Sequence, residues 1–303
     1  MNAWPRILVT GAQGQVGRAL VAAFAETAEV IACDRGALDL SDPDAIRSHV
    51  RQVAPNVILN AAAYTAVDKA ESEPDLAMAI NGRAPGVLAE EAKRAGALLV
   101  HYSTDYVFDG SKNGAWVEDD TTNPLSVYGA TKLAGEQAIQ KAGGKFLIFR
   151  TSWVYAPEGK NFVLTMLRLG RERETLNVVD DQVGAPTTAA ELARATHAIT
   201  TGVLENKFGA RNEWAGIYHM TCGGKVSWCG FARAIFERAP ALLDGKTPKV
   251  NAIASSDYPT PAKRPHNSIL ANQKLYRRFG VQLASWESAL DEVLGAISSE
   301  QPR

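Results

Sequence analysis

A tyrosine and a lysine four positions apart are the first residues whose types and spacing could do chemistry. Tyr128 and Lys132 lie in the segment Ser126-Val127-Tyr128-Gly129-Ala130-Thr131-Lys132, and on a helix side chains four positions apart share one face. A free phenol has a pKa of about 10, and a nearby ammonium favours the phenolate and lowers that pKa. Such a tyrosine can act as a general acid toward a ketone or as a general base toward an alcohol.

A threonine at the end of an apolar stretch could complete this pair. The segment Ala97–His101 is predicted to be a buried strand, and Ser103-Thr104-Asp105 closes it. Ligands of open α/β sheets bind at the carboxyl ends of the strands, so Thr104 is a candidate for holding a substrate carbonyl oxygen beside Tyr128. A Tyr-x-x-x-Lys pair alone is common on exposed helices without a catalytic role, but this threonine and a glycine-rich turn favour catalysis.

Three glycines follow the first apolar segment, Arg6–Thr10, with the spacing G-x-x-G-x-x-G. Gly11 permits a tight turn, Gly14 lets the backbone approach a pyrophosphate because it has no Cβ, and Gly17 lets the next helix lie close to the strand. The N-terminus of that helix presents free N–H groups and a positive dipole end to phosphates. Methyltransferases and plain tight turns contain similar triplets, but a strand before and a helix after the glycines favour nucleotide binding.

An acidic residue ends the second predicted strand, at about the 20-residue offset expected for a carboxylate that binds a ribose. Asp34 would accept hydrogen bonds from an adenosine 2′-hydroxyl and repel a 2′-phosphate, whereas Arg35 beside it could pair with that phosphate. These two neighbours favour NAD and NADP respectively. The choice between NADH and NADPH therefore stays open.

Strand-like and helix-like segments alternate through the first half of the chain. The short apolar runs that predict buried parallel strands are Arg6–Thr10, Val30–Cys33, Asn56–Asn60, Ala97–His101 and Lys145–Arg150. Apolar residues between them recur at helical spacing, and Ser41-Asp42-Pro43 and Thr188-Ala189-Ala190-Glu191 have the spacing of helix caps. This alternation predicts an α/β fold, a Rossmann-like doubly wound parallel sheet.

The alternation loosens beyond about residue 150, where aromatic and proline-bearing loops replace it. We expect a smaller, irregular α/β lobe that binds substrate, includes the short apolar segment Ile217–Met220 and ends in an amphipathic helix after Ser285. The predicted dinucleotide-binding domain comprises residues 1–152 plus about 177–212. The predicted substrate-binding lobe comprises about 153–176 plus 213–303.

Length and composition exclude several classes of protein. The 303 residues are 46% hydrophobic and 21% charged with a formal net charge of −1, which is typical of a globular protein and lacks the positive charge of a nucleic-acid-binding domain. Three scattered cysteines fit neither a disulfide framework nor a zinc site. The sequence has no signal peptide pattern and no apolar run near the roughly 20 residues of a membrane helix. We therefore expect a cytoplasmic protein without nucleic-acid or membrane partners.

Taken together, these motifs resemble the extended short-chain dehydrogenase/reductases and, within them, the dTDP-4-dehydrorhamnose reductase family. The superfamily as a whole shares the glycine turn, the segments 60–71 and 103–108, and the Tyr-x-x-x-Lys pair. The C-terminal half carries the more specific likeness, in the segments 150–155, 181–187 and 264–268. The resemblance therefore spans nearly the whole chain.

The resemblance implies NADPH- or NADH-dependent reduction of the C4 keto group of dTDP-4-dehydro-6-deoxy-L-mannose (dTDP-4-dehydro-L-rhamnose) to dTDP-L-rhamnose, the last step of dTDP-rhamnose biosynthesis. Tyr128 would donate the proton, Lys132 would lower its pKa and hold the nicotinamide ribose, and Thr104 would polarise the carbonyl. Asp105 and Trp153 match substrate-binding positions, although Trp153 could instead be a core residue between the two lobes. The cofactor-binding positions that match are Gly14, Gln15, Val16, Asp34, Asp39, Leu40, Ala63, Tyr64 and Thr65.

The diphosphate of such a substrate needs cations. The candidates are Lys160, Arg168, Lys263 and Arg264, and we prefer Arg264 because it lies in a proline-flanked loop.

Some relatives hold magnesium with carboxylates at a dimer interface. The matching stretches here read Arg18-Ala19 and Ala189-Ala190-Glu191, so Glu191 is their only acid and belongs to the predicted cap. We therefore expect neither the metal nor that mode of dimerisation, and both a monomer and a homodimer stay open.

Other functions fit the same fold. A sugar-nucleotide epimerase would retain NAD through its cycle, and a 4,6-dehydratase usually carries an Asp-Glu pair where this chain has Asp105-Tyr106. A non-catalytic NADP-binding regulatory subunit would be favoured by loss of the catalytic side chains, and all of them are present. Without the resemblance, the pattern reaches only as far as a nicotinamide-dependent enzyme that acts on a carbonyl or an alcohol.

Overall fold

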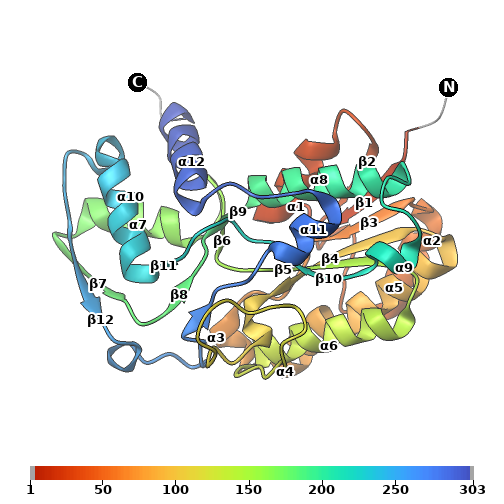
Figure 1. Ribbon diagram of the computed structural model, residues 1–303, viewed down its shortest axis with the longest axis horizontal. Helices are drawn as coiled ribbons and strands as arrows, with labels where there is room; N and C mark the ends of the chain where they lie inside the picture. The colour runs from red at the N-terminus through yellow and green to blue at the C-terminus, as the bar shows by residue number, and fades with distance from the viewer. Residues whose placement is uncertain (1–3, 301–303) are drawn as a thin grey trace.

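A computed structural model describes residues 4–300 and contains a parallel sheet of six strands in the order β10-β5-β4-β3-β1-β2 (Figure 1). The strands are β1 (Arg6–Thr10), β2 (Glu29–Cys33), β3 (Val57–Asn60), β4 (Leu98–Thr104), β5 (Lys145–Thr151) and β10 (Gly216–His219). Strands β2 and β3 lie on opposite sides of β1. The chain therefore changes direction across the sheet between β1 and β3, and such a switch point leaves a crevice at the carboxyl ends of the strands.

Helices cover both faces of this sheet. Helices α1 (Gln15–Phe24) and α8 (Ala189–Leu204) pack on the face to which Ile7 and Val9 of β1 point. Helices α2 (Pro43–Val53), α5 (Ala84–Ala95) and α6 (Val127–Ala142) pack on the other face with Leu8 (Figure 1). Alternate residues of a strand point to opposite faces, so the apolar runs of the strands are buried on both. The predicted doubly wound α/β fold is confirmed.

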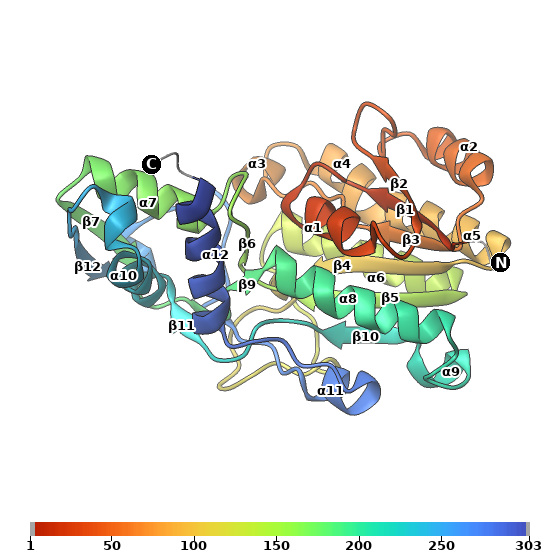
Figure 2. The ribbon, with the colours of Figure 1, turned by 90° about the horizontal axis from the view of Figure 1, so that it is seen from above.

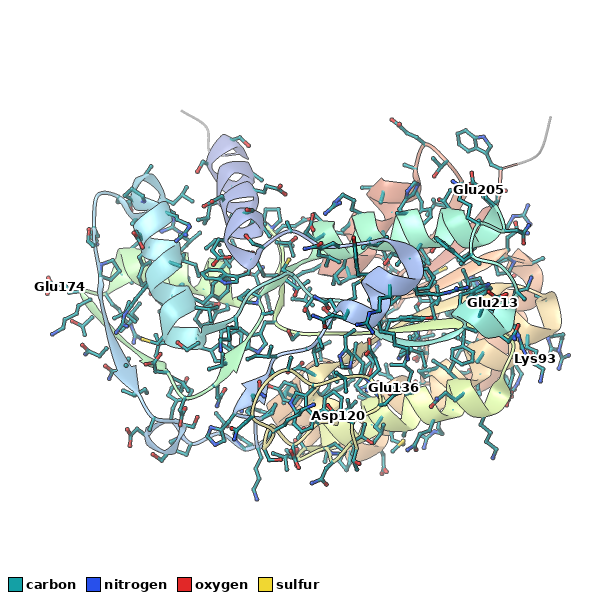
Figure 3. The ribbon with its side chains drawn as sticks, viewed as in Figure 1. Lys93, Asp120, Glu136, Glu174, Glu205 and Glu213 are labelled. Carbon is teal, nitrogen blue, oxygen red and sulfur yellow. The ribbon has the colours of Figure 1, made fainter. Side chains whose placement is uncertain are left out.

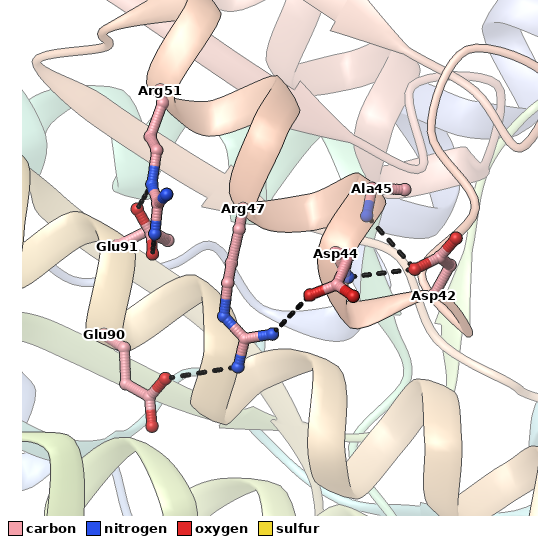
Figure 4. Close-up of polar contacts among 7 residues, drawn as sticks. All are labelled: Asp42, Asp44, Ala45, Arg47, Arg51, Glu90 and Glu91. Carbon is pink, nitrogen blue, oxygen red and sulfur yellow. Dashed lines mark hydrogen bonds and ion pairs between the residues drawn. The ribbon is translucent and has the colours of Figure 1, made fainter.

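Charged contacts join α2 to α5 on the outer surface (Figure 4). The Asp42 carboxylate caps α2 by accepting from the backbone N–H groups of residues 44 and 45, as the sequence predicts. The guanidinium of Arg51 donates twice to the buried carboxylate of Glu91, at 2.8 and 2.7 Å. Because a buried carboxylate is costly without a partner, Arg51 offsets the cost of burying Glu91 beneath α2.

The predicted cap at α8 forms only in part. The Thr188 hydroxyl accepts from the backbone N–H of Glu191 at 3.2 Å. The Glu191 carboxylate does not return to Thr188, because it accepts from Arg194 and from the backbone N–H of Ala284 instead. Glu191 therefore connects α8 to the chain segment that precedes the last helix.

Smaller sheets and three helices form a lobe beside the carboxyl ends of the strands (Figure 2). The short strands pair in the orders β11-β8-β13, β12-β7 and β6-β9. Their bounds are β6 Val154–Tyr155, β7 Thr175–Val179, β8 Val183–Gly184, β9 Thr187–Thr188, β11 Val226–Ser227, β12 Lys249–Ile253 and β13 Asn267–Ser268. The lobe helices are α7 (Phe162–Glu172), α10 (Trp228–Arg238) and α12 (Trp286–Glu300). Helix α11 (Gln273–Phe279) instead packs against β10 of the large sheet. The predicted amphipathic C-terminal helix is confirmed, because Trp286, Leu290, Val293 and Leu294 are buried.

Short helical segments complete the fold. They are α3 (Val67–Ala70), α4 (Pro74–Ala77), a π-helix (Met78–Arg83), α9 (Arg211–Trp214) and three 3₁₀ turns (Asp105–Val107, Pro240–Leu243, Ser255–Asp257). Side chains fill the space between all these layers, from Glu174 at the end of the lobe to Lys93 at the opposite end of the molecule (Figure 3). Within residues 4–300 no helix combines the length and the apolar character that a membrane crossing requires.

Strand pairing bears on the expected division into two domains. Strand β10 comes from the segment that we assigned to the lobe, yet it pairs with β5 in the large sheet. Strand β8 and most of β7 come from the segment of about 177–212, and they pair with lobe strands β12, β11 and β13. The two-domain division stays a prediction, and this pairing supports placing 175–188 in the lobe and 216–219 in the sheet domain.

Candidate functional site

A pocket of about 890 Å³ lies at the carboxyl ends of the strands, at the switch point between β1 and β3. Its walls come from the segments that follow β1, β2, β3, β4 and β5, from α6, and from Trp228 of the lobe. The predicted site residues that line it are Gly11, Gly14, Gln15, Val16, Asp34, Asp39, Leu40, Ala63, Tyr64, Thr65, Thr104, Asp105, Tyr128, Lys132 and Trp153. Gly17 and Arg264 are not among the lining residues.

The glycine turn shapes one end of the pocket. Gly11 has φ of +67°, and a Cβ there would lie 2.7 Å from the Ala62 backbone. A Cβ on Gly17 would lie 2.1 Å from the Gly11 carbonyl oxygen, so Gly17 acts beneath the turn and lets α1 approach it. Gly14 occupies the N-cap of α1 and offers no side chain to the first N–H groups of the helix. Those donors and the positive end of α1 fit a phosphate group.

Asp34 lies at the rim of the same end, at the end of β2. One carboxylate oxygen accepts from Gln13 Nε2 at 2.7 Å, and the other accepts from the Ala37 backbone N–H at 2.9 Å. Arg35 lines the pocket as well. The pocket therefore contains both Asp34, which would bind a ribose, and Arg35, which would bind a 2′-phosphate.

A residue that sequence reasoning missed supports the wall after β3. Asn81, buried in the π-helix, accepts from the Tyr64 backbone N–H at 2.8 Å and donates to the Tyr64 carbonyl oxygen at 3.0 Å. These two bonds hold the segment that carries Ala63, Tyr64 and Thr65. Single π-helical turns inside helices are frequent at functional sites, but the local sequence carries no signal that separates this asparagine from others.

Thr104, Asp105 and Tyr128 meet in the middle of the pocket. The Thr104 hydroxyl donates to Asp105 at 3.0 Å, and burial raises the pKa of Asp105 to about 6. Burial also raises the pKa of Tyr128 to about 12, with the Thr104 hydroxyl acting in the opposite direction and the Asp105 charge adding to the increase. The phenol is therefore protonated near neutrality, as a general acid must be.

Lys132 is held by the backbone and a side chain of β4. Its Nζ donates to the Tyr102 carbonyl oxygen at 2.5 Å and lies 3.2 Å from His101 Nε2. Burial lowers its pKa to about 8, while Glu136 raises it. Burial raises the Tyr128 pKa, and Lys132 is not among the groups that shift it in the protein without cofactor, so the expected lowering by this ammonium stays a prediction.

The Trp153 indole connects the two parts of the molecule. Its backbone has φ of +49°, and its ring stacks on Trp228 of α10 with centroids 3.5 Å apart and planes 10° apart. A Cβ on Gly184 would lie 2.7 Å from the Trp153 ring. Trp153 is thus both a packing residue and a partly exposed wall of the pocket. Trp228 was missed, since no spacing in the sequence relates it to Trp153.

The four candidate cations are spread over the lobe. Arg264 donates to both carboxylate oxygens of Asp68, at 3.1 and 2.8 Å. Arg168 pairs with Glu172 on an exposed helix face, and Lys263 is exposed. Lys160 alone of the four lines the pocket.

Two further observations concern metals and thiols. Between residues 4 and 300 no group of three or more His, Cys, Asp or Glu side chains could hold a metal ion. Cys33, Cys222 and Cys229 are all free and buried. The polar groups that do line the pocket include the hydroxyl of Thr104, the phenol of Tyr128, the ammonium of Lys132, and the carboxylates of Asp34 and Asp105.

Comparison with known proteins agrees with this geometry. The family model described as RmlD substrate binding domain matches residues 5–299. A dTDP-4-dehydrorhamnose reductase of Burkholderia thailandensis is 48% identical over 289 residues, covering 94% of this chain and 96% of the relative.

Solved structures give the same result. A dTDP-4-dehydrorhamnose reductase from Clostridium acetobutylicum has a TM-score of 0.88 at 39% identity, covering 97% of this chain and 99% of the other. The enzyme of the same name from Bacillus anthracis, solved in complex with NADP, has a TM-score of 0.86 at 34% identity, covering 98% and 100%. With relatives that align from end to end in both sequence and structure, this chain belongs to the dTDP-4-dehydrorhamnose reductase family of the extended short-chain dehydrogenase/reductases.

Proposed function

We propose that this protein uses NADPH or NADH to reduce the C4 keto group of dTDP-4-dehydro-6-deoxy-L-mannose, yielding dTDP-L-rhamnose. Family membership supports the substrate, because the relatives named above carry the name of this activity. The observation that carries the proposal is the meeting of Thr104 and a protonated Tyr128 in a pocket that also contains the glycine turn. These groups can polarise a carbonyl and protonate the oxygen that forms.

The residues present fit a nicotinamide dinucleotide. Gly14 at the N-cap of α1 places no side chain before the first N–H groups of the helix, which leaves these donors for a pyrophosphate. Asp34 would bind the adenosine ribose of NADH, and Arg35 would pair with the 2′-phosphate of NADPH. Asp39, Leu40, Ala63, Tyr64 and Thr65 would line the rest of the cofactor site.

The reaction divides into steps that separate residues perform. A bound NADPH or NADH would supply the hydride to C4. Thr104 would turn its hydroxyl proton from Asp105 to the carbonyl oxygen. Tyr128 would transfer its phenolic proton to that oxygen as negative charge develops. The Lys132 ammonium would stabilise the resulting tyrosinate and hold the nicotinamide ribose. Asp105 and the Trp153 indole would orient the sugar.

Two cations are proposed for the substrate diphosphate. Lys160 is supported by its place on the pocket wall. Arg264 was preferred from the sequence, and its use would require the guanidinium to exchange or share its bonds with Asp68. We further propose that the enzyme works in the cytoplasm, which its three free thiols support, as a monomer or a homodimer.

The direct test is loss of reduced-nicotinamide absorbance when dTDP-4-dehydro-6-deoxy-L-mannose is added. Parallel reactions with NADPH and NADH, each with and without magnesium, also measure cofactor preference and ion dependence. Stoichiometric oxidation with formation of dTDP-L-rhamnose is the expected result. Absence of oxidation while the cofactor still binds would overturn the proposal and redirect attention to an epimerase or a regulatory subunit.

A further inference from the structure

Beneath the pocket, four polar side chains from β1, β3, β4 and α6 form a continuous buried chain. Thr10 Oγ1 lies 2.7 Å from Asn60 Oδ1, Asn60 Nδ2 lies 2.9 Å from His101 Nδ1, and His101 Nε2 lies 3.2 Å from Lys132 Nζ. Each of the four residues is at most 2% exposed. Both ends of the chain, Thr10 and Lys132, line the pocket.

The direction of each hydrogen bond follows from counting donors and acceptors. An amide Nδ2 can only donate, so His101 Nδ1 must accept, and the proton of the neutral ring then lies on Nε2. That proton points to Lys132 Nζ, which can accept it only through a lone pair. This order, in which Thr10 donates to Asn60, therefore suits an uncharged lysine.

A charged lysine demands the opposite order. An ammonium has donors only, so His101 Nε2 must accept from it and the ring proton must move to Nδ1. Nδ1–H then needs an acceptor, which a 180° turn of the Asn60 amide provides as Oδ1. The turned amide donates to Thr10 Oγ1, and the Thr10 hydroxyl proton becomes available to an acceptor in the pocket.

We infer that His101 is a positioning residue for Lys132, and that the chain Thr10-Asn60-His101-Lys132 has two hydrogen-bond orders, one for each charge state of the lysine. The catalytic consequence of this inference rests on the proposed function, because it concerns the lysine that would stabilise the tyrosinate. The existence of the two orders does not rest on it.

Histidine suits this position because it remains neutral there. Burial, and then the charge of Lys132, lowers the pKa of His101 well below its ordinary value. A neutral imidazole can move its one proton between the two ring nitrogens and so follow either order. With the Tyr102 carbonyl oxygen and His101 Nε2 both holding the ammonium, one of its three N–H donors remains for the pocket.

Several ionisable groups surround the lysine and the histidine and enter any pH dependence. Glu136 lies one turn further along α6 and is bound by Arg150 of β5 at 2.7 Å. The phenols of Tyr102 and Tyr128 are held protonated by burial. Asp105 has a raised pKa of about 6. Between pH 7 and pH 9, Lys132, with a pKa lowered to about 8, is therefore the group closest to titration.

The test follows the His101 ring nitrogens of the wild-type protein by long-range ¹H–¹⁵N NMR from pH 6 to pH 10. The chain has five histidines, and His101→Gln identifies the signals of His101 by their loss. We expect the Nδ1–H tautomer at low pH and the Nε2–H tautomer at high pH, with the change centred on the titration of Lys132. In Lys132→Met the tautomer should no longer respond to pH.

His219 is the matched internal control. It is fully buried, its Nδ1 lies 3.1 Å from the Trp116 carbonyl oxygen, and it contacts no lysine side chain among its hydrogen-bond partners. Its tautomer should stay Nδ1–H throughout. A single His101 tautomer across the pH range, an imidazolium, or an unchanged response in Lys132→Met would each overturn the inference.

The catalytic consequence has its own readout. The kcat/KM for ketone reduction should fall as pH rises through the Lys132 titration, and His101→Phe should move this alkaline limb about 1 pH unit lower, because the ammonium loses an acceptor. In His101→Gln the amide oxygen can replace Nε2 as the acceptor, so the alkaline limb should move less than half as far as in His101→Phe. An alkaline limb that does not move in folded His101→Phe would show that His101 does not act through Lys132. A protein that switches tautomer but reduces no substrate would instead overturn only the proposed function.

Discussion

At the scale of single residues, the proposed chemistry depends on a phenol that is protonated before the reaction and stabilised as an anion after it. Burial keeps the Tyr128 pKa at about 12, so the proton is present throughout the physiological pH range. Thr104 favours the phenolate, and the Lys132 ammonium can do so when its free donor is engaged in the pocket. Burial thus keeps the phenol protonated before the reaction, whereas Thr104 and Lys132 would stabilise the tyrosinate that forms after proton transfer.

Replacing Tyr128 by Phe removes the proposed general acid while keeping the ring. Turnover should fall roughly 10²-fold or more, the usual scale for loss of such a group, with little change in cofactor affinity. The measurement pairs the absorbance assay with a fluorescence titration of NADPH. Tyr276→Phe, which alters an exposed tyrosine, is the control and should keep wild-type turnover. Near-normal turnover in Tyr128→Phe would remove the assigned acid.

Asp34→Ala tests the choice of cofactor. Without the carboxylate, NADH loses a ribose hydrogen bond and NADPH loses a repulsive neighbour, so the ratio of kcat/KM for NADPH over NADH should rise by about tenfold. Steady-state rates with both cofactors measure this ratio. Asp44→Ala, on the exposed surface of α2, should leave it unchanged. An unaltered ratio in Asp34→Ala would mean that Asp34 does not face the ribose.

At the scale of elements, the turn between β1 and α1 is a tight junction beside the pocket. The backbone of Gly11 lies against Ala62, which follows β3, the neighbour of β1 in the sheet. Helix α1 lies so close to the turn that only glycine fits at position 17. The helix axis is thereby aimed at the pocket, where its free N–H groups can bind phosphate. A side chain at this position would have to displace the turn itself.

Gly17→Ala should therefore destabilise the fold. A Cβ 2.1 Å from the Gly11 carbonyl oxygen forces the backbone to shift, and overpacking of this kind costs about 1–3 kcal/mol or more. Urea unfolding measures the change, and the shifted turn should also weaken cofactor binding. Gly295→Ala is the matched control, because a Cβ there meets open space within α12 and should stabilise by up to about 1 kcal/mol. Equal effects at the two positions would contradict this account of the turn.

At the scale of the whole molecule, contacts between chain segments that are far apart in sequence hold the elements near the pocket together. Asp68 of α3 accepts a hydrogen bond from Arg264, which lies in the loop before β13. Trp153, after β5, stacks on Trp228 of α10. These contacts, together with the bond from Asn161 Nδ2 to Gln15 Oε1 at 2.8 Å, join the predicted sheet domain to the predicted lobe.

Stability of the whole molecule should depend on pH through His219. Burial, and then the charge of Arg150, lowers its pKa to about 3. Because the folded-state pKa lies below the unfolded value, this residue's contribution is present above pH 6.5 and is lost as pH falls toward 3. At pH 5 the loss is about 2 kcal/mol, since only the unfolded chain binds the proton.

His219→Asn tests this dependence, because its amide can still donate to the Trp116 carbonyl oxygen in place of Nδ1. Urea unfolding of the variant and the wild type is compared at pH 8 and pH 5. When the pH is lowered from 8 to 5, the free energy of unfolding of the variant should rise by about 2 kcal/mol relative to that of the wild type. Parallel pH profiles for the two proteins would contradict a neutral, buried His219.

Local sequence patterns were sufficient for much of the fold and for part of the site. The five predicted strands, the glycine turn and the Asp42 cap are confirmed because each depends on residues within one turn or one strand. The ends of parallel strands meet at one edge of a sheet. Segments predicted separately, such as those of Gly11, Thr104 and Tyr128, were therefore brought to one pocket by the predicted topology alone.

Only the tertiary structure decided the rest. β10 joins the large sheet because β5 presents an unpaired edge to it, and Arg264 binds Asp68 across 196 positions of sequence. Asn81, Trp228 and His101 act through partners 17 to 75 positions away, which no spacing rule relates. Whether a side chain faces the pocket, another lobe or a buried lysine depends on packing between elements, because burial and hydrogen-bond partners are properties of the assembled fold and not of the local sequence.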